Sequence, residues 1–258
     1  MLPVPLRVVE ANARAYRRTW KGSAVTSFLG PILFLAAMGL GLGTLVHHST
    51  RIEALSGFSY LAFIAPGLMA AMAMQTAAVE GTWPVMAGMK WIKTFHAALA
   101  TPVEVSDLVL GYLLWVGIRV LMAATAFAIV MMLFRAVPVI DGLAGVGPAV
   151  LTGMAFAAPI VAFTSWIDRE TKLSTLFRFG IMPMFLFSGT FFPVDQLPGW
   201  LQPVAYATPL WHGVELTRAA VLHVPEQVSA PIHVAYLVAL IVVGYAIALK
   251  GFERKLQP

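Results

Sequence analysis

Residues that could carry out covalent chemistry are few and scattered in this sequence. It has no cysteine, which excludes thiol nucleophiles and disulfides, and its six histidines are spread along the chain. It also lacks a phosphate-binding loop (G-x-x-x-x-G-K-[ST]), a zinc-protease helix (H-E-x-x-H) and a nucleophile elbow (G-x-S-x-G). Ser188 and His233 could form an intramembrane serine protease pair; alternatively, Ser188 bonds to a helix carbonyl and His233 lies among lipid headgroups. No metal site is implied.

One charged residue lies in the middle of a long apolar run. Insertion scales assign a cost of roughly 2.5–3.5 kcal/mol to an arginine such as Arg119 at the centre of a membrane helix. Its charge could meet an anionic or hydroxylated group of a substrate, or a lipid phosphate. It could equally tie helices together by binding backbone carbonyls or an acid such as Glu80. Glu80 itself lies at the inner end of the second apolar run, where it is expected to face headgroup water.

The composition indicates that lipid surrounds most of this protein. Of the 258 residues, 59% are hydrophobic and only 11% are charged, whereas soluble proteins have about a quarter charged residues. The net charge of +5 does not indicate nucleic-acid binding, because the basic residues lie between the apolar runs. Without a linker or repeat, residues 1–258 are predicted to form a single all-α integral membrane domain.

Six apolar runs are long enough to cross a membrane as helices. They cover about 24–46, 58–80, 106–134, 143–167, 174–192 and 231–250. With six spans, the 17 Lys and Arg residues divide unevenly: five precede the first span, and two, three and three lie in the second connection, the fourth connection and the tail. The other side has three, and Arg119 lies within a span. The positive-inside rule therefore places both termini in the cytoplasm.

The N-terminal residues predict an amphipathic helix before the first span. On a helical wheel of residues 5–22, Val9, Ala13, Tyr16 and Trp20 share one side and the basic residues gather opposite. Such a helix lies in the membrane surface with its apolar side toward acyl chains. A soluble helix packed on a partner is the alternative.

Residues 89–100, in the second connection, predict a short cytoplasmic helix with two faces. Met89, Ile92, Phe95, His96 and Leu99 fall on one side of the wheel, and Lys90 and Lys93 fall opposite. The helix could insert into a groove of a soluble partner or lie on the bilayer. The sequence Thr101-Pro102-Val103-Glu104 then has the form of a capping box, which predicts that the next helix starts there.

A proline-rich stretch, 193–222, separates the last two spans. Its apolar pieces are too short to cross, which predicts re-entrant or interfacial segments on the outer side. Thr208 and Pro209 have the residue types of an N-cap and a first helical position, so a short helix should run from here toward Leu222.

Two blocks of the sequence resemble the ABC-2 type permeases. The first runs from Lys93 to Val103 and continues through Gly111 and Leu114–Arg119. The second runs from Phe187 to Pro193 and continues through Gln196–Pro198, Pro209–Leu210, Glu215 and Arg218. The chain resembles most the subgroup of nodulation lipo-oligosaccharide exporters and daunorubicin-type drug exporters. The resemblance covers nearly the whole chain in order.

This resemblance implies the type V exporter fold: an interfacial helix, six spans, a cytoplasmic coupling helix and outer re-entrant helices. It implies a dimer with a second permease copy or a homologue, and two copies of an ABC ATPase subunit that binds the ATP and Mg. Membrane lipids are further partners, and nucleic acid is not. Residues of the 89–100 helix would then couple to the ATPase, namely Met89, Lys90, Ile92, Lys93, Phe95, His96 and Leu99. The outer gate would include Phe191, Phe192, Trp200 and Trp211.

The chain is therefore interpreted as the permease subunit of a bacterial inner-membrane exporter for an amphiphilic molecule, such as a lipid-linked saccharide or a drug. It would bind no cofactor itself. The alternatives are a membrane anchor or assembly factor without transport, and an intramembrane hydrolase.

Overall fold

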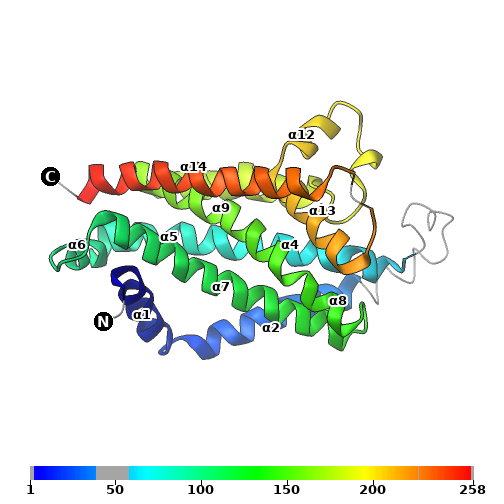
Figure 1. Ribbon diagram of the computed structural model, residues 1–258, viewed down its shortest axis with the longest axis horizontal. Coiled ribbons are helices and arrows are strands. Elements are labelled where there is room, and N and C mark those ends of the chain that lie inside the picture. Colours follow the sequence, from blue (N-terminus) through cyan, green and yellow to red (C-terminus); the bar gives the residue numbers. More distant parts are fainter. Residues whose placement is uncertain (1–2, 39–57, 226, 257–258) are drawn as a thin grey trace.

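The computed structural model describes residues 3–38, 58–225 and 227–256, which form helices and no strand. Long helices run side by side along one axis, and short helices lie at both ends of the bundle (Figure 1). The four helices that are long and apolar enough to cross a membrane cover Tyr60–Trp91, Val105–Leu133, Val139–Trp166 and Ala230–Leu256 of the described residues.

These four helices contain four of the predicted spans. The helix α4 (Tyr60–Gly81) continues through α5 (Trp83–Met86) and η3 (Ala87–Trp91), and α7 (Val105–Leu133) follows the short α6 (Thr94–Leu99). The short α8 (Val139–Ala144) leads into α9 (Val146–Trp166), and α14 (Ala230–Leu256) ends the chain. The helix α9 packs against both α4 and α14, and α4 is the most buried of the four long helices.

The first and fifth predicted spans are matched less completely. The helix α2 (Trp20–Ala36) covers part of 24–46, and residues 39–46 lie outside the described residues. The helix formed by α10 (Thr171–Leu176), η4 (Phe177–Ile181) and α11 (Met182–Phe187) ends before residue 192. It ends there because Gly189 adopts a φ of +79° and turns the chain.

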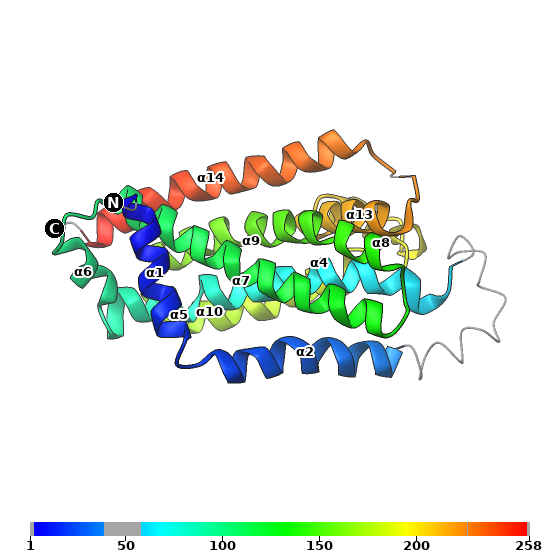
Figure 2. The ribbon, with the colours of Figure 1, turned by 60° about the horizontal axis from the view of Figure 1, so that its bottom comes forward.

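The N-terminal prediction of one helix over 5–22 is wrong in its extent. The helix α1 (Val4–Tyr16) ends at Tyr16, and α2 begins at Trp20 after a turn. The apolar side of α1 packs on α7: the half-buried Val9, Ala13 and Tyr16 contact the core, and the backbone of Pro5 approaches Gly111 of α7. A Cβ at Gly111 would lie 2.5 Å from the Pro5 carbonyl oxygen, so only glycine allows this approach. The position of α1 in the membrane surface stays a prediction. Figure 2 shows α1 lying across the long helices.

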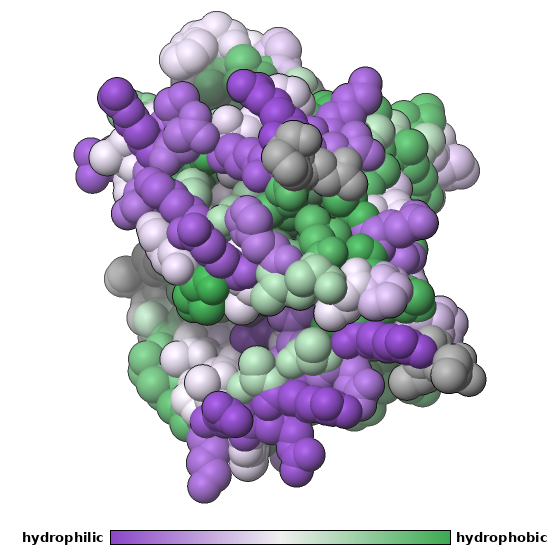
Figure 3. Space-filling view, turned by 90° about the vertical axis from the view of Figure 1, so that its left-hand side faces the viewer, coloured by the Kyte–Doolittle hydropathy of each residue, from purple (hydrophilic) through white to green (hydrophobic). Residues whose placement is uncertain are grey.

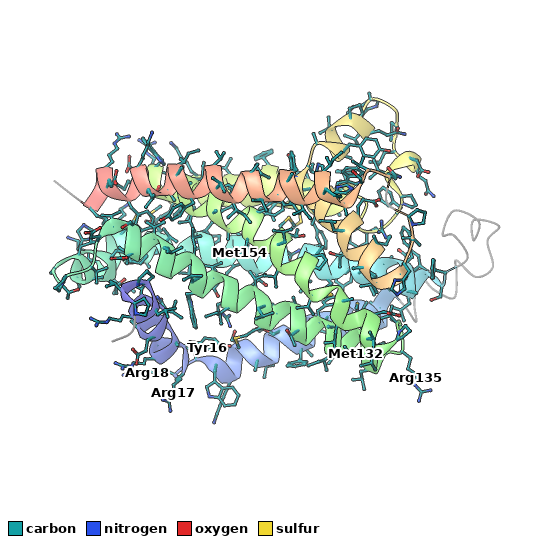
Figure 4. The ribbon with its side chains drawn as sticks, in the orientation of Figure 1. Tyr16, Arg17, Arg18, Met132, Arg135 and Met154 are labelled. Carbon is teal, nitrogen blue, oxygen red and sulfur yellow. The ribbon has the colours of Figure 1, made fainter. Side chains whose placement is uncertain are left out.

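The bundle has two distinct ends. The start of α1, the helix α6 and the end of α14 lie at one end, which we call the termini end (Figures 1 and 2). Polar side chains gather on this end (Figure 3), and Arg17 and Arg18 lie there (Figure 4). The opposite end, which we call the α13 end, contains α8, α12 (Gln202–Tyr206) and α13 (Pro209–Leu222), and Arg135 lies there (Figures 1 and 4).

The start of α13 confirms the prediction made from Thr208 and Pro209. Thr208 is the N-cap, its side chain accepts a hydrogen bond from the Trp211 backbone N–H, and Pro209 is the first helical residue. The helix ends at Leu222, as predicted. The 3-10 turn η5 (Val194–Gln196) and α12 precede α13. The structure contains no membrane, so the re-entrant position of this segment stays a prediction.

Candidate functional site

The segment 89–100 is not one helix. The chain leaves η3 at Trp91, and Lys93 adopts a left-handed φ of 59°, after which α6 begins at Thr94. This break changes which side chains face outward. Phe95 and Met89 are buried in the chain's own core, where the Phe95 ring contacts Tyr112 of α7 and Phe252 of α14. Phe95 is therefore not free to fill a partner's groove, because its own chain already surrounds it.

Of the predicted coupling residues, Lys90, Ile92, Lys93 and His96 are exposed and Leu99 is half-buried. Ile92 is 71% exposed and Trp91 beside it is 46% exposed, so Ile92 is the more accessible of two large apolar side chains here. A cavity of about 480 Å³ lies beside it, and its lining includes Met89, Lys90, Lys93 and His96. Four of the predicted coupling residues are thus brought together at the termini end.

Ion pairs connect this segment to the linker after α9, and that linker to the end of α14. Lys90 Nζ donates to the Asp168 backbone carbonyl at 3.2 Å and lies 3.8 Å from the Glu170 carboxylate, and the Trp91 indole N–H also bonds to Glu170. Lys255 Nζ lies 3.1 Å from the Asp168 carboxylate and holds the pKa of Asp168 below its usual range. The end of η3, the linker after α9 and the end of α14 therefore meet around one cavity.

The capping-box prediction at Thr101 is wrong. The Thr101 hydroxyl donates back to the Ala98 carbonyl, which closes the end of α6. The helix α7 begins only at Val105, with Glu104 as its N-cap. The sequence from Thr101 to Glu104 is compatible with the start of one helix or with the end of another. In the structure, Thr101 closes the end of α6.

Arg119 lies at a junction of four helices. Its Nε donates to the Glu80 carboxylate of α4 at 2.8 Å, and its Nη2 donates to the Ser23 hydroxyl of α2 at 2.7 Å. Its guanidinium lies 4.3 Å from the centre of the Tyr16 ring at the end of α1. Both side chains of the ion pair are largely buried, at 14% and 16% exposed. Glu80 thus faces Arg119, and the expectation that it faces headgroup water is wrong.

The Arg119–Glu80 pair also lines a polar cavity of about 240 Å³ between α2, α4 and α7. The polar lining residues are Ser23, Thr26 and Ser27 of α2, Gln75, Thr76 and Glu80 of α4, and Arg119 of α7. On the other side of Gln75 and Val79 lies a second cavity of about 420 Å³, whose wall is mainly apolar. It is formed by Trp83, Phe177, Ile181, Met182 and Phe185, together with Ser174 and Arg178. One face of α4 is therefore bordered by a polar cavity and by an apolar one.

The predicted outer-gate residues fall into separate places. Phe191 contacts Phe34 of α2 and Phe185 of α11, with ring centres 6.0 and 5.2 Å away. Phe192 packs instead on a small core that includes Trp211, which is 4% exposed. Trp200 is 77% exposed and belongs to neither group. The sequence did not indicate Phe34 or Phe185, because each lies within a long apolar run.

Ser188 and His233 are not partners of each other. Ser188 Oγ lies 2.8 Å from Thr208 Oγ1, and His233 Nδ1 lies 2.7 Å from His212 Nδ1. His233 is fully buried, so the expectation of a wet headgroup position is wrong. His212 stacks on Tyr236 at 4.1 Å and also contacts Trp211. A histidine pair thus joins α13 to α14, and no spacing pattern in the sequence indicated it.

This histidine pair predicts a loss of stability in mild acid. Burial and the neighbouring His233 lower the pKa of His212 from 6.5 to about 4. The unfolded chain therefore binds a proton below pH 6.5 that the folded chain does not, and stability falls as the pH drops from 6.5 toward 4. Thermal unfolding of the purified protein at several pH values in this range measures the effect. His212→Gln should unfold with a flatter pH dependence, and parallel profiles for both proteins would contradict this assignment.

Long apolar helices with a polar junction in their midst and basic residues at one end define a helical, multi-pass membrane protein. A model of the family described as ABC-2 type transporter matches residues 7–222. The chain belongs to the ABC-2 type transporter family. It is a membrane transport subunit of the inner membrane, and the family in general implies an ABC ATPase partner.

Curated relatives agree with this assignment. The chain is 31% identical over 243 residues to Nodulation protein J of Rhizobium meliloti, which covers 93% of this chain and 90% of the relative. It is 33% identical over 246 residues to Nodulation protein J of Sinorhizobium fredii, covering 92% and 89%. It is 25% identical over 246 residues to the Inner membrane transport permease YadH of Escherichia coli, covering 92% and 91%.

Proposed function

We propose that this chain is the permease subunit of a bacterial ABC exporter that moves an amphiphilic molecule across the inner membrane. ATP, with Mg, is hydrolysed by a separate ATPase subunit, two copies of which serve a dimer of permeases. The observation that carries the proposal is the face of α4 formed by Met72, Gln75, Thr76 and Val79, which lies open between α2 and α11.

The two cavities on this face support an amphiphilic substrate. Hydroxyl, amide and charged groups line the cavity toward α2, and aromatic and aliphatic side chains line much of the cavity toward α11. Ligand sites commonly combine an apolar wall with a few polar groups that fix orientation. A molecule with a polar head and an apolar tail matches this division. In this proposal Arg119 either binds the head directly or fixes the shape of the polar cavity.

Six spans follow from the proposal if α2 and the helix from α10 through α11 cross the membrane in addition to the four long helices. The helix α2 runs from the termini end toward the α13 end (Figure 2). The helix from α10 through α11 begins after the Asp168 linker, which pairs with Lys255 at the termini end, and ends at Ser188, whose hydroxyl lies 2.8 Å from that of Thr208 at the start of α13. Both courses are those of the first and fifth spans of a six-span chain. The termini end then lies in the cytoplasm, where Lys90, Ile92, Lys93 and His96 face the ATPase. The α13 end lies outside.

Cysteine labelling tests this orientation, because the chain has no cysteine of its own. Arg135 and Lys172 are both exposed. Arg135 lies at the α13 end (Figure 4), and Lys172 is at the start of α10, which follows the Asp168 linker that pairs with Lys255 at the termini end. In intact cells, Arg135→Cys should react with a membrane-impermeant thiol reagent, and Lys172→Cys should react only after the membrane is opened. The reverse pattern would overturn the orientation, and labelling of both in intact cells would overturn the span count.

Transport itself is tested by reconstitution. The permease and its ATPase are placed in lipid vesicles with fluorescent lipid-linked saccharides and cationic drugs as probes, and ATP is added outside. ATP-dependent movement of at least one amphiphilic probe, lost when the catalytic glutamate of the ATPase is replaced, is the expected result. A complex that hydrolyses ATP and moves none of the probes would contradict the amphiphilic substrate class.

A further inference from the structure

The turn that ends α11 is held in an uncommon backbone conformation. Gly189 has a φ of +79°, which residues with a Cβ rarely adopt, and a Cβ there would lie 3.1 Å from Val194 Cγ2. Ser188 and Thr190, on either side of it, are fully buried. Phe191 follows directly, so the geometry of this turn decides where the Phe191 ring lies.

Two side chains connected to α13 hold this turn. The Thr208 hydroxyl, at the N-cap of α13, lies 2.8 Å from the Ser188 hydroxyl. Further along α13, Arg218 Nη2 donates to the Gly189 carbonyl at 2.8 Å. Because Thr208 and Arg218 are separated by more than two helical turns, they fix both the position and the orientation of the turn relative to α13.

Arg218 is itself held rigidly. It is 7% exposed, its Nη1 donates to Glu215 at 3.2 Å, and its guanidinium lies 4.1 Å from the centre of the Phe63 ring in α4. A Cβ at Gly67 of α4 would lie 3.3 Å from Arg218 Nη2, so α4 also packs closely here. A buried charge is costly unless it is paired, and its removal leaves partners unpaired. Arg218 therefore connects α13, α4 and the end of α11 at one point.

The Phe191 ring completes an aromatic cluster between α2 and α11. Phe34 and Phe185 contact each other with ring centres 6.3 Å apart, and Phe191 contacts both. Phe34 lies one turn beyond Pro31, which lines the polar cavity, and Phe185 lines the apolar cavity. The helix α2 runs toward the α13 end (Figure 2), and α11 ends at Ser188, which contacts Thr208 at the start of α13. This cluster therefore lies at the α13 end of the two cavities.

We propose that Arg218 is a positioning residue that keeps the cluster of Phe34, Phe185 and Phe191 closed across the outer end of the path along α4. This inference rests on the proposed function. Through Gly189, movement of α13 relative to α11 displaces Phe191 and opens the path. Arg218 contacts no substrate in this mechanism, and it acts through the turn.

The barrier can be measured without a substrate or an ATPase. Gln75→Cys places a single thiol on α4 where it lines both cavities. In the closed state an impermeant thiol reagent added outside should label it slowly. Phe191→Ala should raise the labelling rate, and Arg218→Gln should raise it about fivefold or more, the smallest change produced by coupling energies typical between sites. Rates are taken per folded molecule, so a variant that only lowers abundance would not change them.

The matched control is Arg135→Gln, the same substitution at an exposed arginine of the same end, and it should leave the rate unchanged. Ser188→Ala, which removes only the bond to Thr208, should give a smaller increase. If Arg218→Gln does not accumulate as folded protein, the labelling rate of Ser188→Ala is compared with that of the parent Gln75→Cys protein instead.

Several results would overturn the proposal. An unchanged rate in Arg218→Gln, while Phe191→Ala labels fast, would remove Arg218 from the gate. If Arg218→Gln does not fold, an unchanged rate in Ser188→Ala would mean that the contacts between α13 and this turn do not keep the cluster closed. An unchanged rate in Phe191→Ala would mean that the cluster is not the barrier. Because this assay uses the permease alone, failure to find an ATPase would bear on the proposed function and not on this result.

Discussion

Replacing Arg119 with glutamine should sharply lower the amount of folded protein in the membrane. The change leaves the largely buried Glu80 carboxylate without its cation, and breaking a buried pair costs about 3–5 kcal/mol. Glu80→Gln should be harmful for the same reason. Monodisperse protein remaining after extraction and mild heating measures the effect. Arg135→Gln, at an exposed position, should behave as wild type.

A double variant separates the two roles open to Arg119. Replacing a buried pair by apolar residues of similar size is often neutral for stability, so Arg119→Met with Glu80→Met should fold better than either single glutamine variant. If the pair only ties helices, transport returns with the folded protein. If Arg119 binds the substrate head, the double variant folds and assembles but does not transport. Normal abundance and normal transport in Arg119→Gln would contradict both roles.

Phe95→Ala and Ile92→Asp should both reduce ATPase capture, for different reasons. Phe95 lies between Tyr112 and Phe252, and truncating a buried phenylalanine costs about 3–5 kcal/mol of stability. Little folded Phe95→Ala should therefore remain to bind anything. Ile92 is 71% exposed, so Ile92→Asp should leave the fold unchanged.

At an ATPase interface, a charge at position 92 should weaken binding by about 2 kcal/mol or more, as expected for a buried anchor. The measurement is ATPase bound per folded permease. Ile140→Asp is the control, because Ile140 is 81% exposed at the α13 end of the bundle. Wild-type capture by Ile92→Asp would show that this segment lies on the membrane only. Normal folding of Phe95→Ala would contradict its assignment to the core.

The sequence predicted features that depend on residues close together in the chain. Apolar runs of about twenty residues or more located α4, α7, α9 and α14, and Thr208 with Pro209 located the start of α13. The sequence predicted less well where a helix ends within a stretch of amphipathic pattern, such as residues 89–100. The wheel drawn through residues 89–100 assumed one continuous helix, and the left-handed Lys93 rotates the second half relative to the first.

Contacts between distant residues were the least predictable part of the candidate site. The cost of a charge within a span required some partner for Arg119, and Glu80 was named as one possibility, but nothing in the sequence indicated Ser23 or Tyr16. Arg218 lies in a block that resembles the family, yet its bond to Gly189 depends on how α13 packs on α11. Such pairings arise from tertiary packing and have no local pattern.

The composition of the complex tests the central claim most directly. The intact chain is purified from its native membrane in mild detergent, the co-purifying chains are identified, and ATP hydrolysis is measured after transfer to nanodiscs. We expect a separate subunit with a phosphate-binding loop in equal amount to the permease, and ATP hydrolysis that is lost when Ile92→Asp is used. A stable, folded permease that brings no such subunit and shows no ATP hydrolysis would contradict the account.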